Sequence, residues 1–182
     1  MPRKGADLER EVCKLLSEWW TNGQDDAVFW RTSQSGGRAT SRRKKGRETF
    51  GQHGDIAAVN PIGLPFLRAF AVEVKRGYTE KLDLLACFDR KEGSAAPLAV
   101  KWIEQARKSK EASGADSFLI IFRRDRRNTM VLVEGHASTF SYLALRNQFT
   151  VRVGLHQSLS LMTMEEFLQV FRPGEIRRKF KK

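Results

Sequence analysis

The sequence predicts one α/β domain in which a central mixed β-sheet is flanked by helices. Two amphipathic helical patterns, one near the N-terminus and one in mid-chain, alternate with short apolar runs of strand length. Such an order is typical of a mixed sheet covered by helices. The 182 residues, of which 41% are hydrophobic and 30% charged, suit a single core. We therefore assign residues 1–172 to one domain and residues 173–182 to a basic tail.

The first half of the chain predicts a helix followed by three strands. Residues 5–20 form an amphipathic pattern, because their apolar side chains recur at helical spacing along one stripe. A short strand is expected over residues 27–33. Residues 34–54 are rich in glycine, serine and basic residues and predict a loop. Strands at 55–60 and 66–75 are separated by a short Pro- and Gly-containing turn, which predicts an antiparallel hairpin.

The second half predicts a further helix and additional strands. Residues 96–114 read as a helix, with Pro97 near its start and Gly114 beyond its end. The remaining predictions are a buried strand at 116–124, a strand at 128–135, a helical segment within 137–147, a strand at 150–155 and a short capped helix at 163–171. The basic residues from 173 to 182 are expected to fray.

The charge of the chain favours a polyanionic partner. Lys and Arg number 33 against 21 Asp and Glu, which gives a net charge of +12. Nucleic acid is the commonest partner of such a protein. No long apolar span or lipidation motif is present, so we expect no membrane association. The N-terminus lacks the apolar core of a signal peptide, which predicts a cytoplasmic protein.

We expect no chemical role for either of the two cysteines. Cys13 and Cys87 do not form a CxxC pair, so a disulfide framework and a cysteine zinc site are both excluded. The three histidines show no metal-ligand spacing, and His53 is interpreted as a loop residue.

The stretch "AFAVEVKRGY" at 69–78 contains the first chemical signal. Glu73 and Lys75 lie two residues apart within an apolar run and therefore project to the same face of a strand. In the expected hairpin, Asp55 lies close to both of them. Two carboxylates at one end of a sheet can bind Mg²⁺ or Mn²⁺, and the lysine can position an attacking water and offset charge on a phosphate.

Each of these residues also has a simpler interpretation. Asp55 follows a glycine and can be a turn residue at the start of a strand. Glu73 and Lys75 can be a solvated pair on a sheet surface. The apolar residues around them argue against that, because they predict a central strand, where unpaired charges are costly.

"GDIAAVN" followed by "FAVEVK" resembles the signature of the PD-(D/E)XK nuclease superfamily. The resemblance implies a restriction-endonuclease-like core over about residues 5–123. It also implies that Asp55 and Glu73 bind a divalent metal and that Lys75 serves phosphodiester hydrolysis. The chain departs from the pattern in two ways: glycine stands before Asp55 in place of proline, and a long basic segment precedes it.

The opening "KGADLERE" is similar to the start of archaeal-type Holliday-junction resolvases and related phage nucleases. In those proteins a glutamate of the first helix reaches the metal site. The resemblance assigns this role to Glu9 and leaves Glu11 as the alternative, since both flank the apolar stripe of the predicted helix. "WRTSQSGG" is also similar to a segment of those resolvases and implies phosphate contacts by Arg31 and by Ser35 or Ser33.

The mid-chain helix and the basic segments complete the set of candidates. Gln105 matches a glutamine that some relatives carry beside the site, although Ser109 stands where those relatives have tyrosine. A place on the ordinary surface of this helix and a contact with the site are equal alternatives for Gln105. The remaining phosphate-binding candidates are Arg38, Arg42, Arg43, Lys44, Lys45, Arg47 and Arg76.

These observations predict an Mg²⁺-dependent DNA endonuclease, with Mn²⁺ as a substitute metal. The resolvase-like opening implies branched DNA as substrate, and a symmetric junction with two strands to cut implies a homodimer. The alternatives are a restriction- or repair-type nuclease acting on duplex or damaged DNA, and a non-catalytic nucleic-acid-binding module. The expected setting is the cytoplasm of a bacterial or phage-infected cell.

Overall fold

The computed structural model describes residues 4–32, 53–77, 93, 95–135, 149–152 and 158–181. Its elements, in chain order, are α1 (Lys4–Thr21), β1 (Phe29–Arg31), β2 (Ile56–Ala58), η1 (Pro61–Gly63), α3 (Leu64–Ala69), β3 (Phe70–Arg76), α4 (Leu98–Ser113), β4 (Ser117–Arg123), β5 (Thr129–Gly135), β6 (Phe149–Arg152), β7 (Ser158–Thr163), α5 (Met164–Val170) and α6 (Pro173–Lys179). None of the described helices is both long and apolar enough to cross a membrane.

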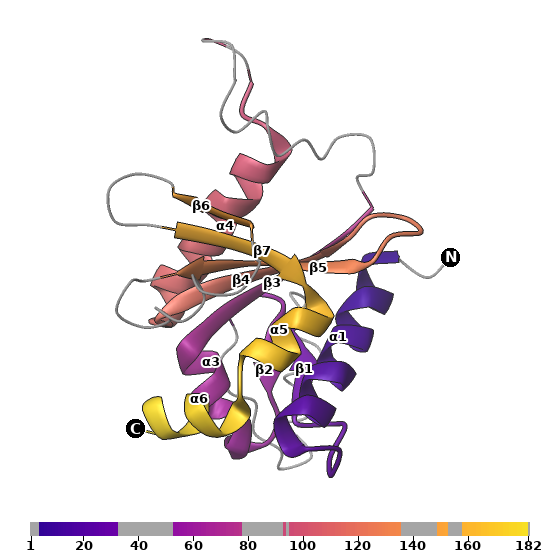
Figure 1. Ribbon diagram of the computed structural model, residues 1–182, viewed down its shortest axis with the longest axis vertical. Coiled ribbons are helices and arrows are strands. Elements are labelled where there is room, and N and C mark those ends of the chain that lie inside the picture. Colours follow the sequence, from indigo (N-terminus) through magenta and orange to yellow (C-terminus); the bar gives the residue numbers. More distant parts are fainter. Residues whose placement is uncertain are drawn as a thin grey trace.

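A five-stranded mixed sheet in the order β3-β4-β5-β7-β6 forms the centre of the molecule (Figure 1). The β3–β4 pair is parallel and the other pairs are antiparallel. β1 and β2 form a separate two-stranded antiparallel sheet. The sheet flanked by helices confirms the predicted fold class.

Two apolar clusters lie on the two faces of the five-stranded sheet. One face of β3 packs its Phe70, Val72 and Val74 against α1, α3, α5 and α6. The opposite face packs against α4 through Trp102 and Ala106. The alternation of side chains along β3 therefore sends Ala71, Glu73 and Lys75 toward α4.

The predicted hairpin between residues 55–60 and 66–75 is wrong. β2 pairs with β1, and Leu64–Ala69 is helical rather than extended. The local reason is that Pro61 is the first residue of η1 and Pro65 the second residue of α3, and proline in the first turn favours a helical start. Phe66 and Ala69 then bury one face of this short helix at a spacing of three residues. The first residues of the predicted strand 66–75 therefore follow the spacing of a helix and not the alternation of a strand.

Three other segments differ from, or add to, the prediction. The tail expected to fray contains α6, whose Ile176 is buried against the cluster on the α1 face. The strand β7 was not predicted. The helical segment expected within 137–147 lies outside the described residues.

Candidate active site

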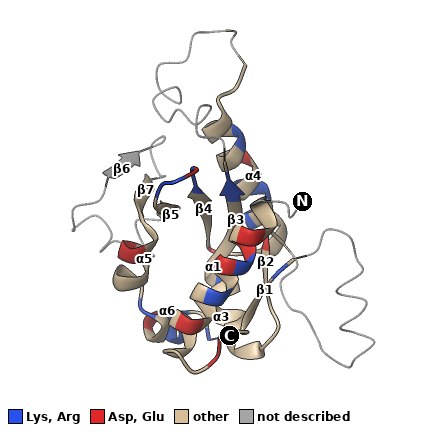
Figure 2. Ribbon diagram, turned by 90° about the vertical axis from the view of Figure 1, so that its right-hand side faces the viewer, with Lys and Arg blue, Asp and Glu red and all other residues tan. Residues whose placement is uncertain are grey.

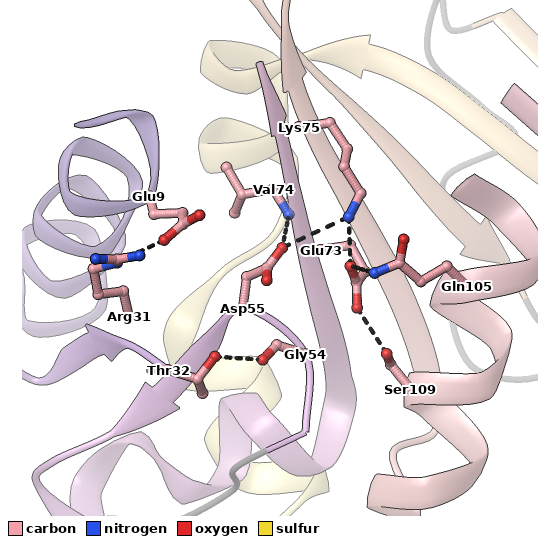
Figure 3. A network of polar contacts seen from close by, with 10 residues as sticks. All are labelled: Glu9, Arg31, Thr32, Gly54, Asp55, Glu73, Val74, Lys75, Gln105 and Ser109. Atoms are coloured by element: carbon pink, nitrogen blue, oxygen red, sulfur yellow. Dashed lines mark hydrogen bonds and ion pairs between the residues drawn. The ribbon is translucent and has the colours of Figure 1, made fainter. Parts of the chain in front are cut away.

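The site lies at the open edge of β3, which is the first strand of the sheet (Figure 3). The segment before β2 runs along this edge and is bonded to it twice. The Asp55 backbone N–H donates to the carbonyl of Val72 at 2.8 Å, and the Val74 N–H donates to Asp55 Oδ2 at 2.8 Å. Asp55 therefore reaches β3 without the predicted hairpin, by taking the place of a neighbouring strand.

Gly54 is required by this close approach. Its φ is +81°, and a Cβ atom added there would lie 2.5 Å from the carbonyl oxygen of Val72. Proline, with φ near −65°, cannot adopt this conformation. The glycine that stands in place of the proline of the superfamily signature thus has a structural cause in this chain.

Thr32 holds the same segment from the other side. Its hydroxyl donates to the Gly54 carbonyl at 2.6 Å, and its backbone N–H donates to the Asp55 carbonyl at 2.9 Å. These two hydrogen bonds therefore hold the end of β1 against the segment that begins β2, directly beside the site.

The three residues of the predicted motif lie together. Lys75 Nζ is 2.7 Å from Glu73 Oε2 and 3.9 Å from Asp55 Oδ2. The side chain of Glu73 is only 2% exposed, and those of Lys75 and Asp55 are largely buried. A buried ion pair requires further hydrogen bonds to offset the loss of hydration.

The helix α4 supplies those hydrogen bonds. Gln105 Nε2 donates to Glu73 Oε2 at 2.7 Å, and Ser109 Oγ donates to Glu73 Oε1 at 2.7 Å. The two residues are four positions apart and so lie on one face of the helix. Gln105, for which site contact and helix surface were equal alternatives, faces the motif. Ser109 was not predicted as a site residue, and its spacing from Gln105 was the signal that could have identified it.

Burial and neighbouring charges raise the pKa of Asp55 from 3.8 to about 6. Loss of hydration is the largest cause, followed by the charge of Glu73, with a smaller contribution from Glu9. The Val74 N–H and the Lys75 ammonium act in the opposite direction. The charge of Glu73 thus disfavours the ionised form of Asp55, and an added cation between the two carboxylates would relieve this repulsion.

Glu9 approaches the site from α1 and forms an ion pair with Arg31. Arg31 Nε donates to Glu9 Oε2 at 2.6 Å, and both side chains are mostly buried. Arg31, predicted to contact phosphate, therefore has a carboxylate partner in the protein itself. Glu11 lies elsewhere, in an ion pair with Arg123. Of the two glutamates that were alternatives, Glu9 is the one whose charge acts on Asp55.

The donor set fits a hard divalent cation. Across the described ranges, no three His, Cys, Asp or Glu side chains are clustered tightly enough to hold a metal by themselves. Asp55 and Glu73 nevertheless offer two carboxylates, and Mg²⁺ is commonly bound by one or two carboxylates with water completing its shell. Asp55 and Glu73 are therefore the residues that would hold such an ion, with Glu9 beside them.

The other predicted phosphate contacts fall into two groups. Arg76 ends β3, next to Lys75. The remaining candidates, Ser35, Arg38, Arg42, Arg43, Lys44, Lys45 and Arg47, lie outside the described residues, as does Ser33.

Comparison with known proteins identifies the family to which the chain belongs. Searches of curated proteins and of solved structures gave no match. A family model described as "Phage putative PDDEXK endonuclease" matches residues 2–178, which is nearly the whole chain. The mixed sheet flanked by helices is consistent with the restriction-endonuclease-like fold of such enzymes. The chain therefore belongs to this phage PDDEXK endonuclease family, and its membership indicates a nuclease.

Proposed function

We propose that the protein is a metal-dependent DNA endonuclease that hydrolyses phosphodiester bonds, with branched DNA such as a four-way junction as its substrate. The observation that carries the proposal is the meeting of Asp55, Glu73 and Lys75 at the edge of β3. Family membership supports the nuclease class. The preference for branched DNA is supported only by the resemblance of the N-terminal segment "KGADLERE" to junction resolvases.

Each residue has a role in this proposal. Asp55 and Glu73 hold Mg²⁺, or Mn²⁺ in its place, and Glu9 assists them. The ion supplies charge stabilisation for the phosphate that is attacked. Lys75 positions the attacking water, and its ammonium offsets developing negative charge on the phosphate. Gln105 and Ser109 orient the Glu73 carboxylate through their hydrogen bonds.

The positive net charge of the chain favours binding of the DNA substrate. With a net charge of +12, the protein attracts DNA phosphates independently of base sequence. Two nicks placed symmetrically in a junction require two sites, so the active form is a homodimer. The reaction takes place in the cytoplasm of a bacterial or phage-infected cell.

A cleavage assay tests the class of substrate. The protein is mixed with labelled four-way, flapped and linear DNA, and with an RNA duplex, in Mg²⁺, Mn²⁺ or EDTA. Cleavage of the four-way form alone, abolished by EDTA, supports the proposal. Cleavage of linear or flapped DNA supports a restriction- or repair-type nuclease instead. Binding without cleavage in either metal supports a non-catalytic binding module. Sedimentation of the protein with a junction measures the number of subunits bound.

Two substitutions test the site itself. Glu73→Gln is expected to abolish cleavage while leaving DNA binding intact, because it removes the charge that binds the cation. Lys75→Met is expected to slow cleavage by about 10²–10⁴-fold, the usual contribution of a group that transfers or positions a proton. Lys108→Met, on the exposed side of α4, is the matched control and should leave the rate unchanged. Undiminished cleavage by Glu73→Gln would show that this site is not the active site.

A further inference from the structure

The turn between β4 and β5 presents a group of arginines that the predicted site did not include. Its residues are Arg124, Asp125, Arg126, Arg127 and Asn128, and we call them the arginine turn. The turn is closed by a hydrogen bond from the Arg127 N–H to the Arg124 carbonyl at 3.1 Å. Arg126 and Arg127 are exposed. Neither side chain has a hydrogen bond or ion pair with any of the residues that the structure describes.

The arginine turn lies at the same end of the sheet as the site. β3 and β4 are parallel, and their register pairs Lys75 with Phe122 and Arg76 with Arg123. The Gly77 N–H continues this ladder by donating to the Arg123 carbonyl at 3.0 Å. At a rise of about 3.3 Å per strand residue, the exposed arginines lie on the order of 10 Å beyond Lys75. Figure 2 shows this basic turn where the chain passes from the tip of β4 to β5, with the tip of β3 beside that of β4.

The base of the arginine turn is anchored, and its tip is not. Arg123 forms an ion pair with Glu11 of α1, and its Nε donates to Thr129 Oγ1 at 2.9 Å. The ion pair attaches the base of the turn to the helix that carries Glu9, and the hydrogen bond joins its two strands. Arg126, in contrast, adopts a positive φ of +59°, a conformation that asparagine or glycine adopts with less strain. No described contact of its side chain offsets this strain.

We propose that the arginine turn binds the DNA backbone beside the scissile phosphate and so positions the substrate on the site. This inference rests on the proposed nuclease function. Guanidinium groups form paired hydrogen bonds with phosphate, and their planar fork makes arginine lose less side-chain entropy per hydrogen bond than lysine does. The contacts are to phosphate and therefore add affinity without reading base sequence.

Salt dependence of binding tests the location of these contacts. The variant Arg126→Asn/Arg127→Gln removes two charges from the turn, and asparagine tolerates the backbone of position 126. The control Arg178→Gln/Lys181→Gln removes two exposed charges at and just beyond α6, at the other end of the molecule (Figures 1 and 2). Affinity for labelled duplex and four-way DNA is measured in EDTA over a range of NaCl concentrations. Each lost phosphate contact lowers the slope of log K against log[salt] by about 0.9, so the turn variant should lose about 2.

The cleavage step separates this inference from the proposed function. In single-turnover reactions the turn variant should need a higher protein concentration to reach half of its maximal rate. The rate at saturating protein should stay unchanged, because phosphate contacts of this kind stabilise the bound substrate and the transition state equally. Equal slopes for the turn variant and wild type, or an equal loss in the α6 control, would overturn the inference. The nuclease proposal fails on a different result, which is binding of DNA by the wild-type protein without cleavage in either metal.

Discussion

At the scale of single residues, Asp55 has two functions that conflict. Its carboxylate accepts the Val74 N–H and so completes the edge of β3. The same position removes it from water and places it near Glu73, which raises its pKa to about 6. In the absence of a cation, the ionised form of Asp55 therefore lowers the stability of the folded protein at neutral pH.

This conflict predicts a pH-dependent gain in stability for Asp55→Asn in EDTA. The pKa of Asp55 in the folded protein, about 6, lies above the ordinary value of 3.8. Between pH 3.8 and pH 6 the folded protein therefore binds this proton more tightly than the unfolded chain does. Wild-type stability should then fall as pH rises through this window, and the amide, which still accepts from Val74, removes that loss. The gain at pH 7 relative to pH 4 should be on the order of 1–3 kcal/mol by urea unfolding.

The exposed residue Asp26 provides the control for this measurement. Asp26→Asn should change stability by less than about 0.5 kcal/mol at both pH values. If Asp55→Asn stabilises the protein equally at pH 4 and pH 7, the explanation is wrong. At pH 4 the side chain of Asp55 in the folded wild-type protein is already neutral, so the substitution removes no charge there.

Gly54→Ala should be strongly destabilising. The new methyl group would collide with the Val72 backbone, and the positive φ adds strain. Gly23 has a similar φ of +82° with no atom within 4 Å of its added Cβ, so Gly23→Ala isolates the strain. Thermal unfolding should show a loss of about 1 kcal/mol for Gly23→Ala and at least about 2 kcal/mol for Gly54→Ala. Equal losses would mean that the approach to Val72 does not constrain this position.

At the scale of elements, α4 is part of the site and more than a covering helix. Its buried residues Trp102 and Ala106 attach it to the sheet, and its polar residues Gln105 and Ser109 reach Glu73 from the same side. The position of the Glu73 carboxylate therefore depends on the packing of a helix that lies some thirty residues later in the chain.

Ser109→Ala tests this dependence. The substitution removes the described donor to Glu73 Oε1, and a buried carboxylate oxygen that loses a hydrogen bond costs about 1–3 kcal/mol of stability. Cleavage should slow as well, since the carboxylate is no longer held. Lys108→Ala, at the neighbouring exposed position, should change neither unfolding nor cleavage. If the two variants behave alike, Ser109 has no role in holding Glu73.

Elements with a strong local signal were predictable from the sequence, and those decided by tertiary contacts were not. The stripe of α1 and the apolar run of β4 are visible in the sequence, as is the capping box of α5, in which Thr163 and Glu166 bond reciprocally. The pairing of β2 with β1 was not visible, because its three residues carry no information about which strand lies beside them. The predicted proximity of Asp55, Glu73 and Lys75 is still found, since Glu73 and Lys75 lie two residues apart on one strand and two hydrogen bonds join Asp55 to that strand.

At the scale of the whole molecule, the C-terminal residues complete the core. The sequence suggested a frayed tail because basic residues dominate it, but Ile176 and Phe180 are four residues apart and face the protein. Arg177 donates to the carbonyl of Trp20 and stacks on its ring, 4.7 Å from the centroid. The end of the chain is thereby attached to its first helix.

Ile176→Ala should accordingly destabilise the protein by about 2–4 kcal/mol, the usual cost of removing a buried aliphatic side chain. Arg178→Ala, on the exposed side of α6, is the control and should stay within about 0.5 kcal/mol. Urea unfolding measures both. A negligible effect of Ile176→Ala would mean that α6 is dispensable for folding.

The joining of Thr32 to Gly54 and Asp55 has a consequence for how this enzyme can be altered. The chain leaves and returns at one point that these hydrogen bonds hold, so we expect that a shorter or longer segment between Thr32 and Gly54 would leave the carboxylates in place. The entropic cost of closing a loop grows only slowly with its length. Replacement of this segment by others should therefore leave Asp55 and Glu73 in place, which comparison of stability and of cleavage between the two forms would check.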